Sequence, residues 1–311
     1  MCKSSPFTRF IAALSLAAAL IVPAANAASK SAASPASAAN AAIARSGILP
    51  VNGVDYYYEL HGQGEPLLLL HGGLGNGATF GPVLKTLAQR HTVILVDLHG
   101  HGRTAMGERP FRIEAIGDDM AALVQRLGYR QVDVMGFSLG GGVALRMAAQ
   151  QPAQVRKLVL VSASYSNNAF YPAIVEQQKA VNAGSAAMFK DTPMYRDYVA
   201  IAPKPDDFPR LLDALGNFMT TPFDWSADVA KLAGPVMLVY GDSDLYRPES
   251  EIAFYQLLGG GQRDGGWQRE GVSKNRLAIL PDLTHYEIAT SPRLVETVEP
   301  FLSAAAGKTA P

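Results

Sequence analysis

The segment that most constrains the fold is residues 132–142, VDVMGFSLGGG. An apolar, β-branched run leads into a serine flanked by glycines, and a helix-like segment follows, so the pattern predicts a strand, a tight turn and a helix. Such a turn projects the hydroxyl of Ser138 but holds its backbone in a sparsely populated conformation. The residues two before and two after the serine then nearly touch, which suits Gly136 and Gly140. Five-residue patterns recur by chance, so it is the flanking segments that make Ser138 a candidate nucleophile.

Strand-like and helix-like segments alternate on both sides of this serine. The sequence Asn52-Gly53 between β-formers predicts a hairpin of two antiparallel strands at the start. Together with the strand before Ser138, these segments predict an α/β domain with a mostly parallel, eight-stranded sheet flanked by helices. Further strands are expected at residues 66–70, 92–96, 157–161, 236–240 and 276–280, and helices at 79–89, 114–127, 139–150 and 292–303.

About seventy residues separate the strand ending at residue 161 from the strand beginning at 236, which is too long for a simple crossover. We therefore expect an inserted helical cap at residues 164–227, between two parts of the core at 46–163 and 228–311. Some of its aromatic and methionine side chains should line an apolar pocket over the serine. A glycine-rich stretch at 259–271 predicts a surface loop, with Trp267 as its anchor or as a pocket contact.

The first 27 residues are typical of a secretory signal peptide. Lys3 and Arg9 precede an apolar run at residues 10–22, and Ala-Asn-Ala at 25–27 provides a cleavage site. Residues 28–45, rich in Ala and Ser, predict a flexible linker. We expect export to the periplasm or beyond, with no stable membrane anchor after cleavage.

Cleavage would also change the charge and the sulfur chemistry of the chain. The sequence has 27 Lys and Arg against 27 Asp and Glu, and losing two positive side chains leaves 25 against 27, a formal charge of −2. The only cysteine, Cys2, would be lost, so neither a disulfide nor thiol chemistry is expected. No polybasic surface is evident, so a nucleic-acid partner is not expected.

A nucleophilic serine needs a base, and the base needs a group that orients it. His285 follows the last predicted strand and precedes the last helix, which puts it at the same edge of the sheet as Ser138. The acid should follow the penultimate strand, where Asp242 and Asp244 are both available. We favour Asp244 because it lies further into the turn and can reach under His285. Asp242 is the alternative, and would otherwise cap the turn.

An oxyanion that forms on the substrate needs two N–H donors. Leu139, the first residue after the serine, should provide one from the N-terminus of the following helix. The loop at residues 71–77 (HGGLGNG) follows a buried strand, and its glycines allow a close approach of the backbone to a substrate. Gly73 is therefore expected to provide the second N–H.

Taken together, these motifs resemble those of the α/β-hydrolase superfamily, in the branch of serine esterases, lactonases and C–C hydrolases that carry a helical cap. The resemblance implies hydrolysis of a small apolar ester or lactone through an acyl-enzyme, with no cofactor or metal; C–C bond or amide cleavage are alternatives. His99 departs from the pattern, where the family usually has arginine. The motifs are His71-Gly72-Gly73, Asp97-x-x-Gly100-x-Gly102-Arg103, Gly136-x-Ser138-x-Gly140-Gly141, Gly241-x-x-Asp244 and His285.

Three other interpretations compete with this one. Residues 73–78 match G-x-G-x-x-A after an apolar strand, with Asp97 about twenty residues on, as in a dinucleotide-binding site. That interpretation leaves the serine, acid and base unexplained. His99 and His101 could suggest a metal pair, but no third ligand is evident. A non-catalytic small-molecule binding protein on the same fold is the third alternative, because a fold does not fix a function. The sequence does not indicate an oligomeric state.

Overall fold

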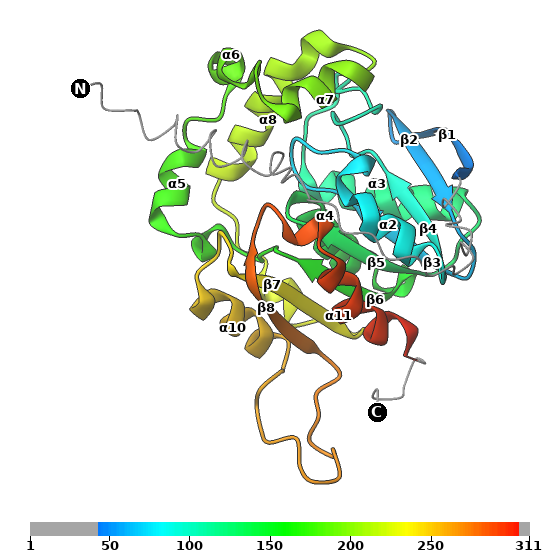
Figure 1. Cartoon of the computed structure of the whole chain (residues 1–311), viewed down its shortest axis with the longest axis vertical. Coiled ribbons are helices and arrows are strands. Elements are labelled where there is room, and N and C mark those ends of the chain that lie inside the picture. Colours follow the sequence, from blue (N-terminus) through cyan, green and yellow to red (C-terminus); the bar gives the residue numbers. More distant parts are fainter. Residues whose placement is uncertain (1–42, 305–311) are drawn as a thin grey trace, which may run out of the picture.

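The computed structural model of the chain describes residues 43–304 (Figure 1). The predicted signal peptide at residues 1–27 and the linker up to residue 42 lie outside the described residues. The linker was expected to continue to residue 45, and this boundary is wrong. Strand β1 already begins at Ile43, because Ile43 pairs with His61 and Arg45 with Leu60 of the next strand.

The described residues contain one eight-stranded sheet with the order β1-β2-β4-β3-β5-β6-β7-β8. Only the pairs β1–β2 and β2–β4 are antiparallel, which confirms the predicted mostly parallel sheet. The strands are β1 (Ile43–Val51), β2 (Val54–His61), β3 (Glu65–Leu70), β4 (His91–Val96), β5 (Val132–Phe137), β6 (Val155–Val161), β7 (Val236–Ser243) and β8 (Arg276–Thr284).

The predicted hairpin at Asn52-Gly53 is confirmed. Asn52 has a φ of 47° and Gly53 a φ of 83°, and Val51 pairs directly with Val54. Two consecutive residues with positive φ form the kind of two-residue turn whose twist matches that of paired strands.

Helices cover both faces of the sheet (Figure 1). In β3, Leu68 and Leu70 face the core beneath α3 (Ile113–Arg126), α4 (Leu139–Gln150) and α10 (Pro248–Leu257), whereas Leu67 and Leu69 face the core beneath α2 (Gly81–Leu87) and α11 (Pro292–Ser303). This alternation explains why the strand is apolar at every position.

The helix expected at 79–89 is divided. A 3-10 turn, η2 (Gly77–Phe80), precedes α2, because Gly81 has a φ of 41° and interrupts the helical path.

Residues 164–227 form short helices that lie above the sheet in Figure 1. They pack around Phe208, whose ring contacts those of Phe189, Tyr195 and Tyr198 at centroid distances of 5.0–5.9 Å. The helices are α5 (Pro172–Gln178), α6 (Ala186–Phe189), α7 (Pro193–Ile201), α8 (Phe208–Thr220) and α9 (Ser226–Val229), the last of which crosses the predicted boundary at residue 227.

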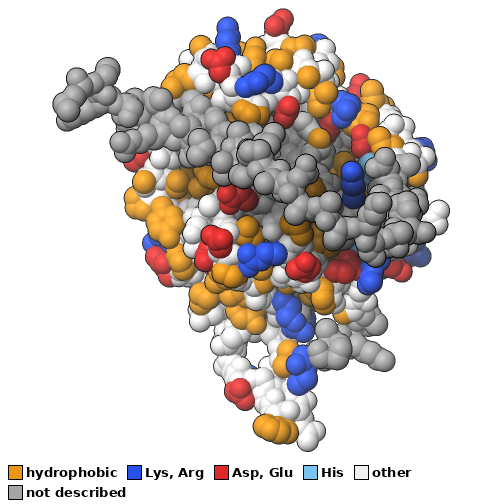
Figure 2. Space-filling model, viewed as in Figure 1, with side chains coloured by type: hydrophobic (Ala, Val, Ile, Leu, Met, Phe, Trp, Pro, Cys, Tyr) orange, Lys and Arg blue, Asp and Glu red, His pale blue; other side chains and the backbone are white. Residues whose placement is uncertain are grey.

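The loop between α10 and β8 stands clear of the rest of the molecule (Figures 1 and 2). Trp267 is 97% exposed, so the expectation that it anchors the loop or contacts the pocket is wrong. The loop is held at its base instead, where the side chain of Asn275 donates to the carbonyl of Leu258 and accepts from the N–H of Val236. None of the helices between residues 43 and 304 is long and apolar enough to cross a bilayer.

Candidate active site

The turn between β5 and α4 presents Ser138 at the carboxyl edge of the sheet. Its φ of 53° and ψ of −117° confirm the predicted unusual backbone conformation. The flanking glycines are required by space, because a Cβ on Gly136 would overlap the carbonyl oxygen of Gly140. A Cβ on Gly140 would in turn overlap the carbonyl oxygen of Leu70, at the end of β3. The two glycines therefore allow the close backbone packing beneath the turn, and this packing makes the serine side chain project from the sheet.

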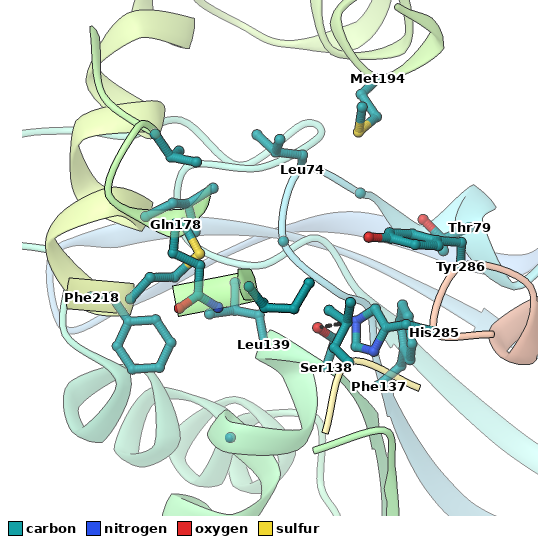
Figure 3. A pocket seen from close by; sticks show the side chains of 18 of the residues that line it. Leu74, Thr79, Phe137, Ser138, Leu139, Gln178, Met194, Phe218, His285 and Tyr286 are labelled. Atoms are coloured by element: carbon teal, nitrogen blue, oxygen red, sulfur yellow. Dashed lines mark hydrogen bonds between the residues drawn. The ribbon is translucent and has the colours of Figure 1, made fainter. Parts of the chain in front are cut away.

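The structure brings Ser138, His285 and Asp244 together from three distant parts of the chain. Nε2 of His285 lies 3.0 Å from Oγ of Ser138, and its Nδ1 lies 2.8 Å from Oδ1 of Asp244. Figure 3 shows the imidazole directed at the serine hydroxyl. The ring packs between Phe137, Tyr246 and Tyr286, at centroid distances of 5.1–6.1 Å. A base and its orienting acid are thus within hydrogen-bond reach of a candidate nucleophile.

Asp244 is buried, and both of its carboxylate oxygens accept hydrogen bonds. Oδ1 accepts from the N–H of Leu245 at 2.7 Å besides His285, and Oδ2 accepts from the hydroxyl of Ser162 and, at 3.4 Å, from the N–H of Gly241. Burial alone would raise the pKa of Asp244, but the charge of His285 and these hydrogen bonds together lower it below its ordinary value. The carboxylate therefore stays ionised beside the imidazole.

Asp242, the alternative acid, is exposed and lies at the end of β7. The expected turn-capping role is wrong, because β7 continues through this residue. Its carboxylate faces the hydroxyl of Ser243 at 3.4 Å rather than the N–H groups of the turn.

Ser162 was not identified from the sequence. It follows β6 directly and is completely buried, with a φ of 47°. The N–H of Ser162 donates to the carbonyl of Val239 in β7, and its hydroxyl donates to Asp244. The available signal was its position, since a small polar residue directly after a buried parallel strand lies at the same edge as the other site residues.

The two expected oxyanion donors lie on opposite sides of the serine turn, at one cavity. Leu139 begins α4, so its N–H has no acceptor within the helix. Gly73 lies in a turn closed by a hydrogen bond from the N–H of Gly75 to the carbonyl of Gly72, and Leu74 at its corner has a φ of 59°. A Cβ on Gly73 would lie 3.9 Å from the side chain of Leu139, so the loop and the serine turn are in close proximity.

A cavity of about 430 Å³ lies between the cap and this edge of the sheet (Figure 3). Ser138, His285, Gly73 and Leu139 all line it, and no Lys or Arg among residues 43–304 does. The size and the mainly apolar wall are typical of sites for small molecules. The sequence predicted that some cap side chains line this pocket, and the structure shows which: Ser164, Phe170, Ile174, Gln178, Val181, Phe189, Met194, Asp197, Leu215, Phe218, Met219, Phe223 and Trp225.

Asp97, which the sequence suggested as part of a dinucleotide-binding site, has another role in the structure. The carboxylate of Asp97 is buried and accepts from the N–H groups of Gly77 and Arg103, both at 2.8 Å, which ties two loops together. Burial raises its pKa. These bonds occupy the oxygens that would have to recognise a ribose.

His99 and His101, which could have suggested a metal site, form hydrogen bonds with the backbone instead. His99 bonds through Nε2 to the carbonyl of Met106, and His101 through Nδ1 to that of His99. Burial, reinforced by the charge on His71, lowers the pKa of His101 to about 3, so it is neutral. Within residues 43–304, no group of three or more His, Cys, Asp or Glu side chains could hold a metal ion.

Comparison with known proteins gives matches over different lengths. A family model described as alpha/beta hydrolase fold matches residues 65–191. An uncharacterized protein from Mycobacterium tuberculosis is 40% identical over 113 residues, or 36% of this chain, and the match spans only 33% of that protein's length. A pimeloyl-[acyl-carrier protein] methyl ester esterase from Aeromonas hydrophila is 27% identical over 270 residues, covering 78% of this chain and 98% of the esterase.

Among solved structures, E-2-(acetamidomethylene)succinate hydrolase matches 84% of this chain and 99% of its own, with a TM-score of 0.64 and 20% identity. At that identity the match concerns the fold alone.

Proposed function

We propose that this chain, which has the α/β-hydrolase fold, is a serine hydrolase that cleaves a carboxylic ester or lactone through an acyl-enzyme. The observation that carries the proposal is the continuous path of hydrogen-bond contacts from Ser138 through His285 to Asp244, with distances of 3.0 and 2.8 Å. This path ends at a cavity that can admit a small molecule.

In the proposed reaction, Oγ of Ser138 attacks the carbonyl carbon of the ester while Nε2 of His285 takes its proton. Asp244 stabilises the imidazolium that forms, and the N–H groups of Gly73 and Leu139 bind the oxyanion. The tetrahedral intermediate then breaks its bond to the alcohol oxygen, which receives the proton from His285. Water then attacks the acyl carbon while the same imidazole takes its proton. The second tetrahedral intermediate breaks its bond to Oγ of Ser138, which receives this proton from His285, and the acid leaves.

The lining of the cavity supports a neutral, mainly apolar substrate. Aromatic and aliphatic side chains form most of the wall, and in the described part of the chain no Lys or Arg lines it. A substrate carboxylate or phosphate placed inside would lose its hydration without gaining a cationic partner, which is costly. The acyl and alcohol groups are expected to be uncharged where they enter the pocket.

Hydrolysis of chromogenic esters tests the proposal directly. We expect the wild-type chain to release nitrophenol from p-nitrophenyl esters, and Ser138→Ala to lower kcat by at least about 10⁴-fold. Retention of activity in Ser138→Ala, or no turnover of any acyl length by the wild type, would overturn it. In the second case, ligand binding without turnover would favour the non-catalytic alternative.

A pair of acid variants tests the assignment of the orienting residue. Asp244→Asn should lower kcat by about 10²–10⁴-fold, because the imidazole loses its charged partner. Asp242→Asn should stay within about twofold of the wild type, since Asp242 is exposed and does not contact His285. The reverse order of effects would exchange the roles of the two residues.

A further inference from the structure

We propose that Gln178 recognises one hydrogen-bonding group of the substrate, so that the pocket selects neutral esters whose apolar chain carries a single carbonyl, hydroxyl, amide or ether group. The inference rests on the proposed ester hydrolysis and identifies a specificity-determining residue for it. Gln178 is a positioning contact for the substrate chain and takes no part in bond making.

The amide of Gln178 lies in the cavity wall and has no hydrogen-bond partner among residues 43–304. The residue ends α5 and is only 5% exposed, and it lines the cavity. Its side chain makes no hydrogen bond to any residue between 43 and 304, and Figure 3 shows the amide directed into the cavity. A buried amide offers two donors and an acceptor, and leaving them unpaired is unfavourable. Because the site leaves this group without a protein partner, a ligand group can satisfy it.

The surroundings of Gln178 make it distinctive within its part of the wall. Among the lining residues from 170 to 225, it is the one uncharged polar side chain, and the other polar residue, Asp197, is exposed. Val181 and Trp225, which line the same cavity, are buried and apolar. Apart from Asp197, a substrate chain that lies against this wall meets hydrocarbon except at the amide.

Three of the other polar side chains in the lining, those of Ser164, Asn76 and Thr79, have hydrogen-bond partners. The hydroxyl of Ser164 donates to the carbonyl of Ser166 at 2.9 Å, and the amide oxygen of Asn76 accepts from the N–H of Ala78 at 2.8 Å. The hydroxyl of Thr79 accepts from the N–H of Asn76. These groups are used to hold the local backbone, whereas the amide of Gln178 is not.

Backbone packing holds Gln178 in position. The N–H of Val181 donates to the carbonyl of Gln178 at 3.1 Å, which turns the chain after α5. This turn lies directly against α8, because a Cβ on Gly216 would overlap the carbonyl oxygen of Val181. The close approach fixes the end of α5 against α8, so the backbone that carries the amide is already in place before a ligand binds.

A site built to pair with a polar group discriminates against analogues that lack it, because the buried protein group is then left unpaired. A neutral hydrogen bond of this kind corresponds to roughly a fivefold to tenfold preference. A hydrocarbon chain is therefore expected to bind less well than a chain of equal length with one oxygen in reach of the amide. A carboxylate is not favoured, because none of the lining residues that the structure describes is a Lys or Arg.

The test compares matched esters on the wild-type chain and two variants. The substrates are p-nitrophenyl octanoate, a series of p-nitrophenyl esters of equal length with one ketone or ether oxygen at successive positions, and p-nitrophenyl acetate. We expect the wild type to prefer one oxygen-bearing ester by about tenfold in kcat/KM. Gln178→Leu should lose this preference, through a better use of octanoate and a poorer use of the oxygen-bearing ester. Acetate, which is short, should be hydrolysed equally within about twofold.

Gln177→Leu provides the matched control, because it makes the same chemical change on the neighbouring residue of α5, which does not line the cavity. This variant should keep the preference of the wild type. An unchanged preference in Gln178→Leu, or the same loss in Gln177→Leu, would overturn the inference.

A binding measurement separates this inference from the proposed hydrolysis. Trp225 lines the cavity, so its fluorescence can follow binding of the same esters to Ser138→Ala, with and without Gln178→Leu. If no ester is turned over by the wild type, the hydrolase proposal fails, and tighter binding of the oxygen-bearing ester that depends on Gln178 still supports the inference. Equal binding of all the octanoyl-length esters to both variants would overturn it.

Discussion

At the scale of single residues, the hydroxyl of Ser162 determines how Asp244 is held. It donates to Oδ2 from the end of β6, opposite the oxygen that faces His285. Ser162→Ala removes one of the bonds that keep the carboxylate ionised and oriented, so we expect kcat to fall about tenfold, with KM within about twofold. The pKa of Asp244 should also rise, because one of the hydrogen bonds that lower it is lost, and an NMR titration of its carboxyl carbon can measure this shift. A loss of kcat without this shift would indicate a structural role only.

Glu251 is a second buried carboxyl near the site. It lies in α10, is 3% exposed, and its side chain makes no hydrogen bond or ion pair among the described residues. Burial, followed by the negative charge of Asp244, raises the pKa of Glu251 to about 8, and Tyr240 and Tyr246 are the other titratable groups that sense it. The folded protein therefore binds a proton that the unfolded chain releases above its ordinary pKa of 4.5.

The sign of the resulting effect on stability follows from proton linkage. Between pH 4.5 and about 8 the folded state binds more protons than the unfolded state, so stability falls as the pH rises through this window. Glu251→Gln removes the titration. We expect it to raise Tm at pH 8.5 by about 3 °C or more, and to change it little at pH 5, since ~1 kcal/mol shifts Tm by about 2–4 °C in a domain of this size. The exposed Glu249→Gln is the control, and an equal gain at both pH values would contradict the assignment.

At the scale of elements, the order of strands and helices is predictable because local pattern and burial agree. Helix α4 begins and ends where the sequence indicates, at Leu139 and Gln150, since the serine turn and Pro152 define it. Strand ends are less predictable, because pairing with a neighbour extends them. Strand β8 was expected to end at residue 280 but reaches Thr284, where its partner Ser243 continues β7.

The difference between local sequence pattern and packing in space also explains which site residues could be inferred from the sequence. Ser138, Asp244 and His285 each follow a strand, so the topology of a parallel sheet places them at one edge before any side-chain contact is known. Ser162 and Gln178 depend on which groups surround them in space. A serine after a strand and a glutamine at a helix end have many possible roles in a sequence, and only the position of Asp244 and of the cavity distinguishes these two.

At the scale of the whole molecule, the two ends of the parallel strands have separate roles. The proposed catalytic residues lie at the carboxyl ends, whereas the long loop before β8 enters the sheet at the amino end and projects away from the cap (Figure 1). Residues 261–264 and 267–270 of this loop are exposed, and its hydrogen bonds are mainly internal, such as that from the N–H of Gly271 to the carbonyl of Gly265 at 2.8 Å.

Shortening this loop tests that separation. We expect replacement of residues 261–272 by a short glycine–serine turn to leave ester turnover within about twofold and Tm within about 2 °C, because the deleted segment contributes little buried surface and a shorter loop costs less closure entropy. Asn275→Ala, by contrast, leaves the loop in place but removes the acceptor of the N–H of Val236 and the donor to Leu258. That variant should lose about 1–3 kcal/mol of unfolding free energy. If the shortened loop abolished activity while Asn275→Ala did not, the loop would have a role at the site that its position at the opposite edge of the sheet does not predict.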